Sequence, residues 1–302
     1  MKKLILSSVL ISSLFATEEN YIEFGAMALK TDDNFSTSSK KNISSLNGSG
    51  SENDALPYIE FLYAYKLADS YNVYLKSFAG EFNLGSKISS NLGNFDLGLK
   101  MNLLNEEWEN PFLTNTNREE TDTKEFGAYI AYELLSNSKF KSTIKYEISN
   151  KSYDNDTVQS ELKRDGVRNI ISMNNMYHSS LFNLPTTYLN KVSFENYQAD
   201  GDASSYNEVD LAFGLTSKLS EKLRMTLLTN IGKQDYDAIN PVLNKSIDVD
   251  IYGVKAIFKY DKPFDYKNTY VSFKTGIEKE NANDNFYDKE SAFGIVSLGY
   301  KF

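Results

Sequence analysis

The sequence predicts an all-β protein, a transmembrane antiparallel up-and-down β-barrel of about 14 strands, with 12 strands as the alternative. Three observations predict it: apolar and polar residues alternate along most of the chain, the alternating segments are long, and the connections between them fall into two alternating length classes. No apolar run after residue 16 approaches the roughly 18 residues that a membrane helix needs, so a helical membrane protein is excluded.

The alternation is clearest in FDLGLKMNLL, which begins at Phe95. Phe95, Leu97 and Leu99 share one face of an extended chain, and Asp96 and Lys100 share the other. A soluble β-sandwich would alternate in the same way. The segments are about ten to fourteen residues long, which suits a tilted membrane-spanning strand better than the usual five or six residues.

The connections separate the two cases further. Short connections lie at 66–72, 88–94, 134–140, 182–188, 218–224 and 260–266, and longer polar ones lie between them at 31–55, 108–122, 151–163, 200–204, 235–245 and 281–287. Short periplasmic turns and long outer loops are typical of outer-membrane barrels. The predicted strands are 21–30, 56–67, 71–79, 81–89, 94–107, 123–135, 139–150, 164–182, 186–199, 205–218, 222–234, 246–260, 267–280 and 288–302, an even number that places both termini in the periplasm.

The N-terminal segment MKKLILSSVLISSLFA predicts a secretory signal peptide over 1–16, followed by a single barrel domain over 17–302. The chain has no cysteine, so it has no disulfide and no cysteine-based metal site. Its net charge of −9 argues against nucleic acid as a partner. Because the first strand follows the signal directly, we expect no N-terminal plug, which argues against a plugged fatty-acid or TonB-dependent transporter.

One face of each predicted strand is apolar and the other carries charge. In lipid the apolar face must point outward, so we expect the charged face to line a lumen. The candidate pore-lining residues are Lys66, Lys76, Lys100, Glu133, Lys141, Lys145, Glu147, Lys191, Glu195, Lys218, Arg224, Lys255, Lys259 and Lys274. They describe either a water-filled pore with a mild anion preference or a lumen closed by salt bridges.

The loop WENPFLTNTNREETD, 108–122, contains the only tryptophan. It is a candidate constriction loop that folds into the lumen, with Trp108 and Phe112 as anchors, Arg118 against interior carboxylates, and Glu119 and Glu120 beside it. The alternative is a solvated cap whose acidic residues meet water.

No residue pattern predicts catalysis, a cofactor or a metal site. His178 and Ser180 share a strand face, which resembles the serine–histidine pair of outer-membrane phospholipases, but no other part of that signature is present. The acidic pairs at 153–156, 200–202, 235–237 and 283–285 lack a full calcium-loop pattern and suit turns.

The chain ends in AFGIVSLGYKF, which reads as the final strand. Val296, Leu298, Tyr300 and Phe302 are expected to face lipid, and the strand must pair with the first one because a barrel in lipid leaves no edge unpaired. Its terminal aromatic pattern also resembles the signal that outer-membrane assembly machinery recognises in its clients, so that machinery and outer-membrane lipid are expected partners.

Four stretches carry a resemblance to a family: WENPFLTNTNREETD, LKRDG at 162–166, GKQDYDAINPVLNKS at 232–246 and NFYDKESAFGIVSLGYKF at 285–302. Together they resemble an uncharacterised family of bacterial outer-membrane proteins that is known only as a domain of unknown function. The resemblance implies a β-barrel in the outer membrane and carries over no activity, ligand or catalytic residue.

The sequence thus favours a porin-like channel for passive diffusion of small hydrophilic solutes, and not an enzyme. One alternative is a non-conducting barrel whose outer loops bind a partner, for which the polar loop 31–55 would be suited. An outer-membrane lipid hydrolase is the weakest alternative.

Overall fold

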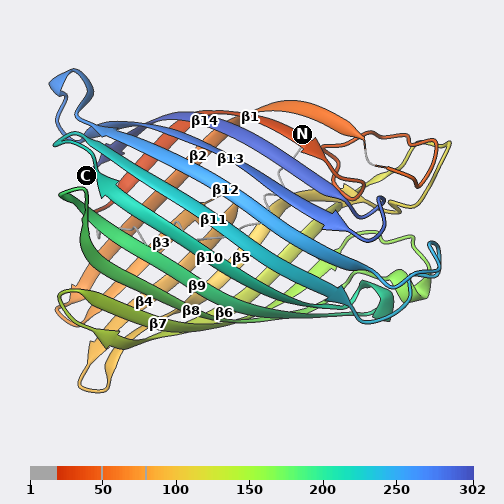
Figure 1. The fold of residues 1–302 in the computed structure, drawn as a ribbon. Helices are drawn as coiled ribbons and strands as arrows, with labels where there is room; N and C mark the ends of the chain where they lie inside the picture. Colours follow the sequence, from red (N-terminus) through yellow and green to blue (C-terminus); the bar gives the residue numbers. More distant parts are fainter. Residues whose placement is uncertain (1–18, 49, 79) are drawn as a thin grey trace.

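The computed structural model describes residues 19–48, 50–78 and 80–302, and these form one closed antiparallel barrel of 14 strands (Figure 1). Each strand pairs with its neighbours in the sequence, and β1 closes the ring against β14. The predicted fold class is confirmed, with 14 strands and not 12. The predicted signal peptide, 1–16, lies outside the described residues.

The strands agree with the predicted ranges to within a few residues at most ends. They are β1 Tyr21–Asp32, β2 Ser51–Ala68, β3 Tyr71–Phe78, β4 Glu81–Ser90, β5 Gly93–Trp108, β6 Glu120–Ser136, β7 Phe140–Tyr153, β8 Gly166–Leu181, β9 Leu184–Ala199, β10 Tyr206–Lys218, β11 Leu223–Tyr236, β12 Asp248–Asp261, β13 Thr269–Ala282 and β14 Lys289–Lys301.

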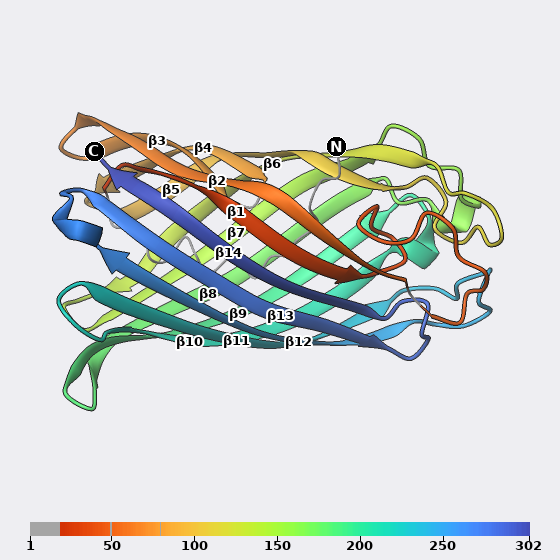
Figure 2. The same ribbon diagram turned by 90° about the horizontal axis from the view of Figure 1, so that it is seen from above.

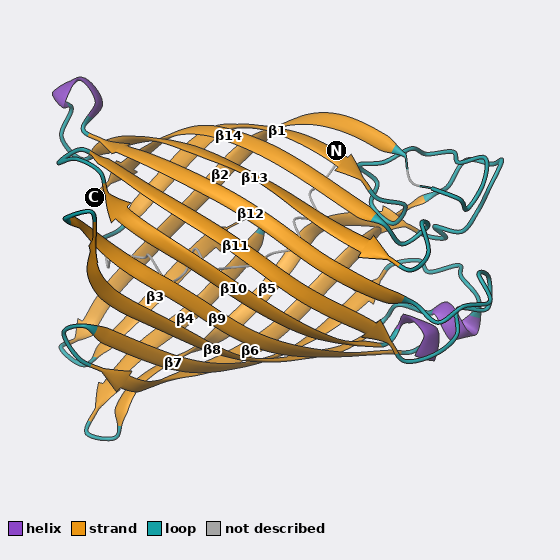
Figure 3. Cartoon of the chain, in the orientation of Figure 1, coloured by secondary structure: helices purple, strands orange, loops and turns teal. Residues whose placement is uncertain are grey.

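The two ends of the barrel differ as the connection lengths predict. Short turns join the strands at one end, here called the short-turn end, where β1 begins and β14 ends. Loops 33–50, 109–119, 154–165, 200–205, 237–247 and 283–288 gather at the other, the long-loop end (Figure 2). Three 3-10 turns interrupt the loops: η2 Ser160–Leu162 and η3 Asp202–Ser204 at the long-loop end, and η4 Pro263–Asp265 at the other (Figure 3). No helix among the described residues is long and apolar enough to cross a membrane.

The last strand shows how alternation sorts side chains between the two faces. Val296 and Leu298 are 58% and 57% exposed on the outer face, whereas Ile295 and Ser297 between them are 4% and 3% exposed on the inner face. The outward apolar row and the inward polar row follow from the two-residue period of a strand, whose successive side chains point to opposite faces. The orientation expected for this strand is confirmed.

Closure of the ring depends on the pairing of β1 with β14. The two strands run in register from Tyr21 opposite Lys301 to Asp32 opposite Glu290. Beyond the strand, the amide of Phe302 donates to the carbonyl of Asn20 at 3.0 Å. The Phe302 ring stacks near Tyr300 and Tyr63 on the outer face, where aromatic side chains suit the interface between lipid and water. Phe302 therefore takes part in the junction between β1 and β14 that closes the barrel.

The barrel wall is shorter at β3 and β4 than at the strands on either side. β3 and β4 have 8 and 10 residues, whereas their neighbours β2 and β5 have 18 and 16. The expected start of β2 at residue 56 is wrong: β2 begins at Ser51, because residues 51–60 continue to pair with β1 above the point where β3 stops. A polar sequence such as SEND carries no alternation, so its place in a strand depends on the ladder that β1 provides.

The facing of the last strand makes a testable prediction. Val296→Arg places a charge on the lipid face near the middle of β14 and should reduce the free energy of unfolding of the barrel in phosphatidylcholine vesicles by about 2–4 kcal/mol. Asn174→Arg, on the lumen face of β8, should cost much less. Urea titrations of the vesicle-inserted barrel would measure both, and equal costs would contradict the assigned faces.

Candidate functional site

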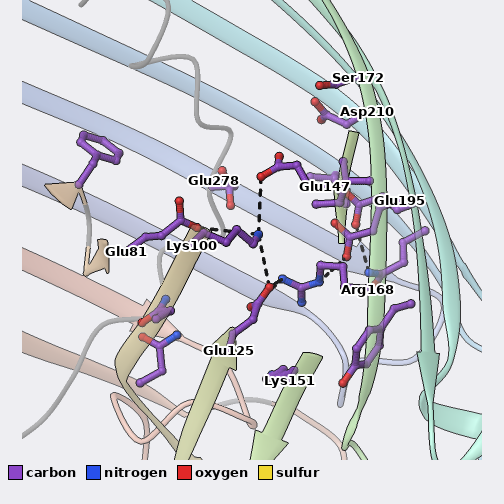
Figure 4. Close-up of a pocket in the computed structure, with 18 of the residues that line it drawn as sticks. Glu81, Lys100, Glu125, Glu147, Lys151, Arg168, Ser172, Glu195, Asp210 and Glu278 are labelled. Atoms are coloured by element: carbon purple, nitrogen blue, oxygen red, sulfur yellow. Dashed lines mark hydrogen bonds and ion pairs between the residues drawn. The ribbon is translucent and has the colours of Figure 1, made fainter. Parts of the chain in front are cut away.

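The lumen contains a cavity of about 430 Å³ that lies between the inward faces of the strands. Its walls are unusually rich in charge, and the charged side chains lie close enough to pair with one another (Figure 4). Because charges are costly to remove from water unless they are paired, these contacts explain how so many ionic side chains fit into one barrel.

Lys100 of β5 is at the centre of one network. Its ammonium lies 3.4 Å from Glu125, 3.8 Å from Glu147 and 4.0 Å from Glu81 (Figure 4). Arg168 of β8 continues the network, since it lies 3.2 Å from Glu125 and 3.0 Å from a carboxylate oxygen of Glu195. The network spans the six strands from β4 to β9 and leaves each member with an opposite charge beside it.

A second network lies nearer the short-turn end and is more deeply buried. The ammonium of Lys274 lies 3.0 Å from Glu23 and donates at 2.7 Å to Glu60. Tyr58 and Tyr21 donate to Glu60, the latter at 2.6 Å. Glu23 is only 3% exposed. It also accepts bonds from hydroxyl groups, so both carboxylates have full sets of partners.

The second network lies at the boundary between two cavities of the lumen. A smaller cavity of about 120 Å³ lies on the short-turn side, and Tyr21, Glu60 and Phe78 line both it and the large cavity. These three side chains therefore stand at the boundary between the two cavities. All three belong to strands of the barrel wall: Tyr21 to β1, Glu60 to β2 and Phe78 to β3.

The predicted lumen residues divide into four groups. Lys76, Lys100, Lys145, Glu147, Lys191 and Glu195 line the large cavity, and Arg224, Lys259 and Lys274 line the small one. Lys255 pairs at 3.1 Å with Glu278, which lines the large cavity. Glu133 and Lys141 pair with each other, and Lys66 and Lys218 are exposed at the short-turn ends of their strands; none of these four lines either cavity.

The charge of the lining differs from the expected lysine excess. In the large cavity carboxylates outnumber basic side chains. Among the carboxylates that the sequence analysis missed are Asp33, Glu107, Glu125, Glu208, Asp210 and Glu280, whereas alternation does place Glu278 on the inner face. Basic residues outnumber acidic ones only in the small cavity. A reading of the alternation could have placed Glu125 and Glu208 on the inner face, but Asp33 and Glu107 depend on how the loops and strand ends pack.

The expectation that loop 108–122 constricts the lumen is wrong. No residue of 108–120 lines either cavity in the described part of the chain. Arg118 is buried, but its guanidinium donates to the carbonyls of Asn34, at 2.6 Å, and of Pro111 and Lys40, not to interior carboxylates. The loop is held beside the first loop, and its acidic residues Glu119 and Glu120 are exposed.

Trp108 explains why the loop takes this position. Trp108 is 1% exposed, and the central carbon of the Arg118 guanidinium lies 4.7 Å from the centre of its ring. A cation over the face of an aromatic ring is attracted by the ring's electrons, and more strongly when water is excluded. On its backbone side, the carbonyl of Trp108 accepts a bond of 2.9 Å from Arg164. Two arginines thus fix the end of β5 from both sides.

Arg164 is a structural residue that the sequence analysis did not single out. It pairs with Asp156 at 2.7 Å and with Glu107 at 3.4 Å, and it lies over the Tyr153 ring. Burial by itself lowers the pKa of Arg164, but Tyr153 and the two carboxylates together hold that pKa above its usual value. The stretch LKRDG was recognised as a family feature, and the arginine in it is the signal that could have suggested a buried ion pair.

The long loops pack together into an apolar cap at the long-loop end. Ile43, Ile247, Val249, Ile251, Phe286 and Tyr287 form its core, and Phe35 and Phe112 pack against it. The rings of Phe112 and Phe286 stack with centres 4.9 Å apart. Phe35 and Tyr287 also line the large cavity, so the underside of the cap forms the cavity's wall at this end.

The four stretches that carry the family resemblance meet in this cap. Phe112 of the first contacts Phe286 of the fourth, and Asn240 of the third donates to the Tyr287 hydroxyl at 2.9 Å. Arg164 of the second binds the carbonyls of Trp108 and Glu109 in the first. Residues far apart in sequence therefore specify one shared structure at the long-loop end.

No motif found in the sequence gains a catalytic setting. His178 is exposed near the short-turn end, and its Nδ1 lies 2.9 Å from the Thr187 hydroxyl. Among the residues described, no three histidine, cysteine or acidic side chains are placed to hold a metal ion together.

Comparison with known proteins identifies the family of the chain. A family model described as "Protein of unknown function (DUF2860)" matches residues 19–301. The chain belongs to this family. No curated protein matches the sequence. The match covers the whole barrel and agrees with the family resemblance seen in the sequence.

One solved structure supports the fold. A FadL homologue of Pseudomonas aeruginosa superposes with a TM-score of 0.53 over 94% of this chain and 91% of its own, at 9% identity. An anion-selective porin from Comamonas acidovorans gives a TM-score of 0.44 over 93% and 98%, at 8% identity. At such low identity the likeness concerns the fold alone, which is that of a bacterial outer-membrane barrel.

The buried network at Lys274 makes a prediction about stability. Lys274→Met leaves Glu23 and Glu60 without their cation, and removing one partner of a buried ion pair costs about 3–5 kcal/mol. The triple variant Lys274→Met, Glu23→Gln, Glu60→Gln should recover most of that loss. Urea unfolding of the reconstituted barrel measures both, and an unaffected single variant would show that the network contributes little.

Asp33, in the cap, predicts a pH dependence. Burial raises the pKa of Asp33 to about 6, against an ordinary value of 3.8. A raised pKa in the folded state means that the group stabilises the cap most at low pH and that this contribution is lost as pH rises through 6. Amide hydrogen exchange of loop 33–50, corrected for intrinsic rates, should show stronger protection at pH 5 than at pH 7.5. Asp33→Asn should remove the difference, and a difference that persists would assign it to another group.

Proposed function

We propose that the protein is a narrow outer-membrane channel for passive diffusion of small charged or polar solutes, with its long loops outside the cell and its short turns in the periplasm. The observation that carries this proposal is the pair of cavities along the barrel axis, which share Tyr21, Glu60 and Phe78 as a common boundary. A lumen of linked cavities with hydrated, charged walls is what a polar solute requires.

The small volume of the lumen supports a channel that selects solutes by size. The large cavity, about 430 Å³, falls at the small end of the range of ligand sites. The ion pairs that cross it reduce the open section below that of a general porin of 16 to 18 strands. Solutes would pass singly by exchanging contacts with these pairs, so conductance should be small.

The charge of the walls modifies the anion preference expected from the lysines. Carboxylates predominate in the large cavity and basic groups in the small one. An ion that crosses the lumen would pass one stretch of wall with mainly negative charge and another with mainly positive charge. Neither cations nor anions are therefore attracted along the whole path. We expect weak ion selectivity, with a slight preference for cations at the long-loop end. A surface-binding barrel without conductance is the second candidate, and the packed cap over the long-loop end favours it.

Planar-bilayer recording of the purified barrel separates the two. We expect small, discrete conductance steps for the wild type. Phe78→Ala removes a large ring from the boundary between the cavities and should increase the step size about twofold or more, since conductance is limited by the narrowest section. Phe213→Ala, which removes the same ring from the lipid face, is the matched control and should leave the step unchanged.

Two other results of the bilayer recordings would contradict parts of this proposal. Absence of steps in the wild type and in both variants over a range of voltages would contradict a channel and favour the surface-binding barrel. Steps that respond alike to both variants would place the narrow section elsewhere.

A further inference from the structure

Three basic side chains lie in a row across the inner face of β10, β11 and β12 near the short-turn end. Lys218 lies opposite Arg224, and Arg224 lies opposite Lys259. These three residues are here called the basic row. Side chains directly opposite each other in antiparallel strands have Cβ atoms about 5 Å apart, and like charges there destabilise the pair. The basic row therefore has a cost in stability that nearby negative charge would have to offset.

The carboxylates that line the small cavity beside the basic row are paired with other cations. They are Glu19, Glu23 and Glu60. A carboxylate oxygen of Glu19 lies 2.8 Å from the Lys301 ammonium. Glu23 and Glu60 share the ammonium of Lys274, at 3.0 Å and 2.7 Å. These acids therefore do not serve as the counter-charges of the basic row.

Arg224 and Lys259 are the two members of the basic row that line the small cavity. Among the residues described, no carboxylate lies within ion-pairing distance of either side chain, and no oxygen accepts a hydrogen bond from them. The contact nearest to the Lys259 ammonium is the Tyr270 ring, whose centre lies 3.5 Å away. In a lumen whose other cations mostly pair with acids, these two charges are available to a ligand.

The small cavity has the size and position of a site for a small solute. Its volume of about 120 Å³ corresponds to about four waters at roughly 30 Å³ each. Arg224 lies near the start of β11 and Lys259 near the end of β12, at the end of the barrel that carries the C-terminus (Figure 1). Glu19 is exposed at this end and lines the same cavity, so the cavity can be reached from the short-turn side.

The two cations differ in a way that suits an oxyanion. The planar guanidinium of Arg224 can donate two parallel bonds to a pair of oxygens, and the compact ammonium of Lys259 adds a second charge. Tyr270, which is 1% exposed, packs its ring against this ammonium and so limits the positions that the charge can take. An anion between the two cations would replace their mutual repulsion with attraction.

We propose that the small cavity binds a small divalent oxyanion such as phosphate between Arg224 and Lys259. The proposal names a class of solute that the barrel would hold at its short-turn end. A role of the site in transport rests on the channel function proposed above, because the bound anion would lie in the path of a solute. Binding itself does not require conduction, so the two can be tested separately.

Titration with inorganic phosphate tests the site. The barrel is kept in uncharged, phosphorus-free dodecyl maltoside micelles at low salt, with empty micelles as the blank, and ³¹P NMR line broadening follows the phosphate. We expect saturable binding at one site per barrel. Arg224→Gln and Lys259→Gln should each weaken it about tenfold or more, as the loss of a charge-assisted bond does. Lys267→Gln removes the same charge from an exposed turn at the same end and should have no effect.

A conservative variant separates charge from folding. Lys259→Arg keeps the positive charge and should bind phosphate within about threefold of the wild type, since a charge-assisted bond is still possible. Sulfate should compete with phosphate, and tetramethylammonium should not. Absence of saturable binding in the wild type, or equal binding by the wild type and both glutamine variants, would overturn the site.

Planar-bilayer recording then relates the site to the channel. At constant ionic strength, replacing part of the chloride with phosphate should reduce the wild-type conductance step several-fold more than that of the double variant Arg224→Gln, Lys259→Gln. Phosphate binding in micelles without any conductance step would support the site and count against the channel. Conductance steps from a barrel that binds no phosphate would support the channel and overturn the site.

Discussion

The structure depends on one constraint: a chain that crosses lipid must pair its own backbone N–H and C=O groups. The barrel meets it by pairing every strand with its sequence neighbours and by joining β1 to β14. That last pairing unites the two ends of the described chain, and it turns a sheet with two edges into a ring with none. The outward apolar rows, the inward charges and the position of the terminal Phe302 all follow from it.

Once the ring is closed, the apolar faces must be outside, and charge must be accommodated within. The lumen does this by pairing lysines and arginines with carboxylates across the barrel, as Lys100 and Lys274 do. Such pairs contribute little net stability, because desolvation cancels much of the attraction. Their effect is geometric: they tie opposite walls together and leave two small cavities in place of one wide pore.

The barrel wall is shortest at the hairpin of β3 and β4. Pairing of β2 with β3 begins at Phe61 and pairing of β4 with β5 ends at Asn102, so the hairpin ends below the neighbouring strands β2 and β5. At the long-loop end the loops pack around Trp108 and Phe286, which are 1% and 0% exposed. This end of the barrel thus combines an apolar cluster of loops with a short wall at the hairpin.

The sequence alone determined the all-β class, the strand positions and which residues face lipid, because a two-residue period and a closed ring leave a single consistent arrangement. It also indicated most of the charged inner face. Tertiary structure decided what depends on partners distant in the sequence: the start of β2 at Ser51, the carbonyl contacts of Arg118, the acidic balance of the large cavity and the boundary between the two cavities at Phe78. Alternation assigns each side chain to a face, but only the assembled barrel brings together those from different strands and loops.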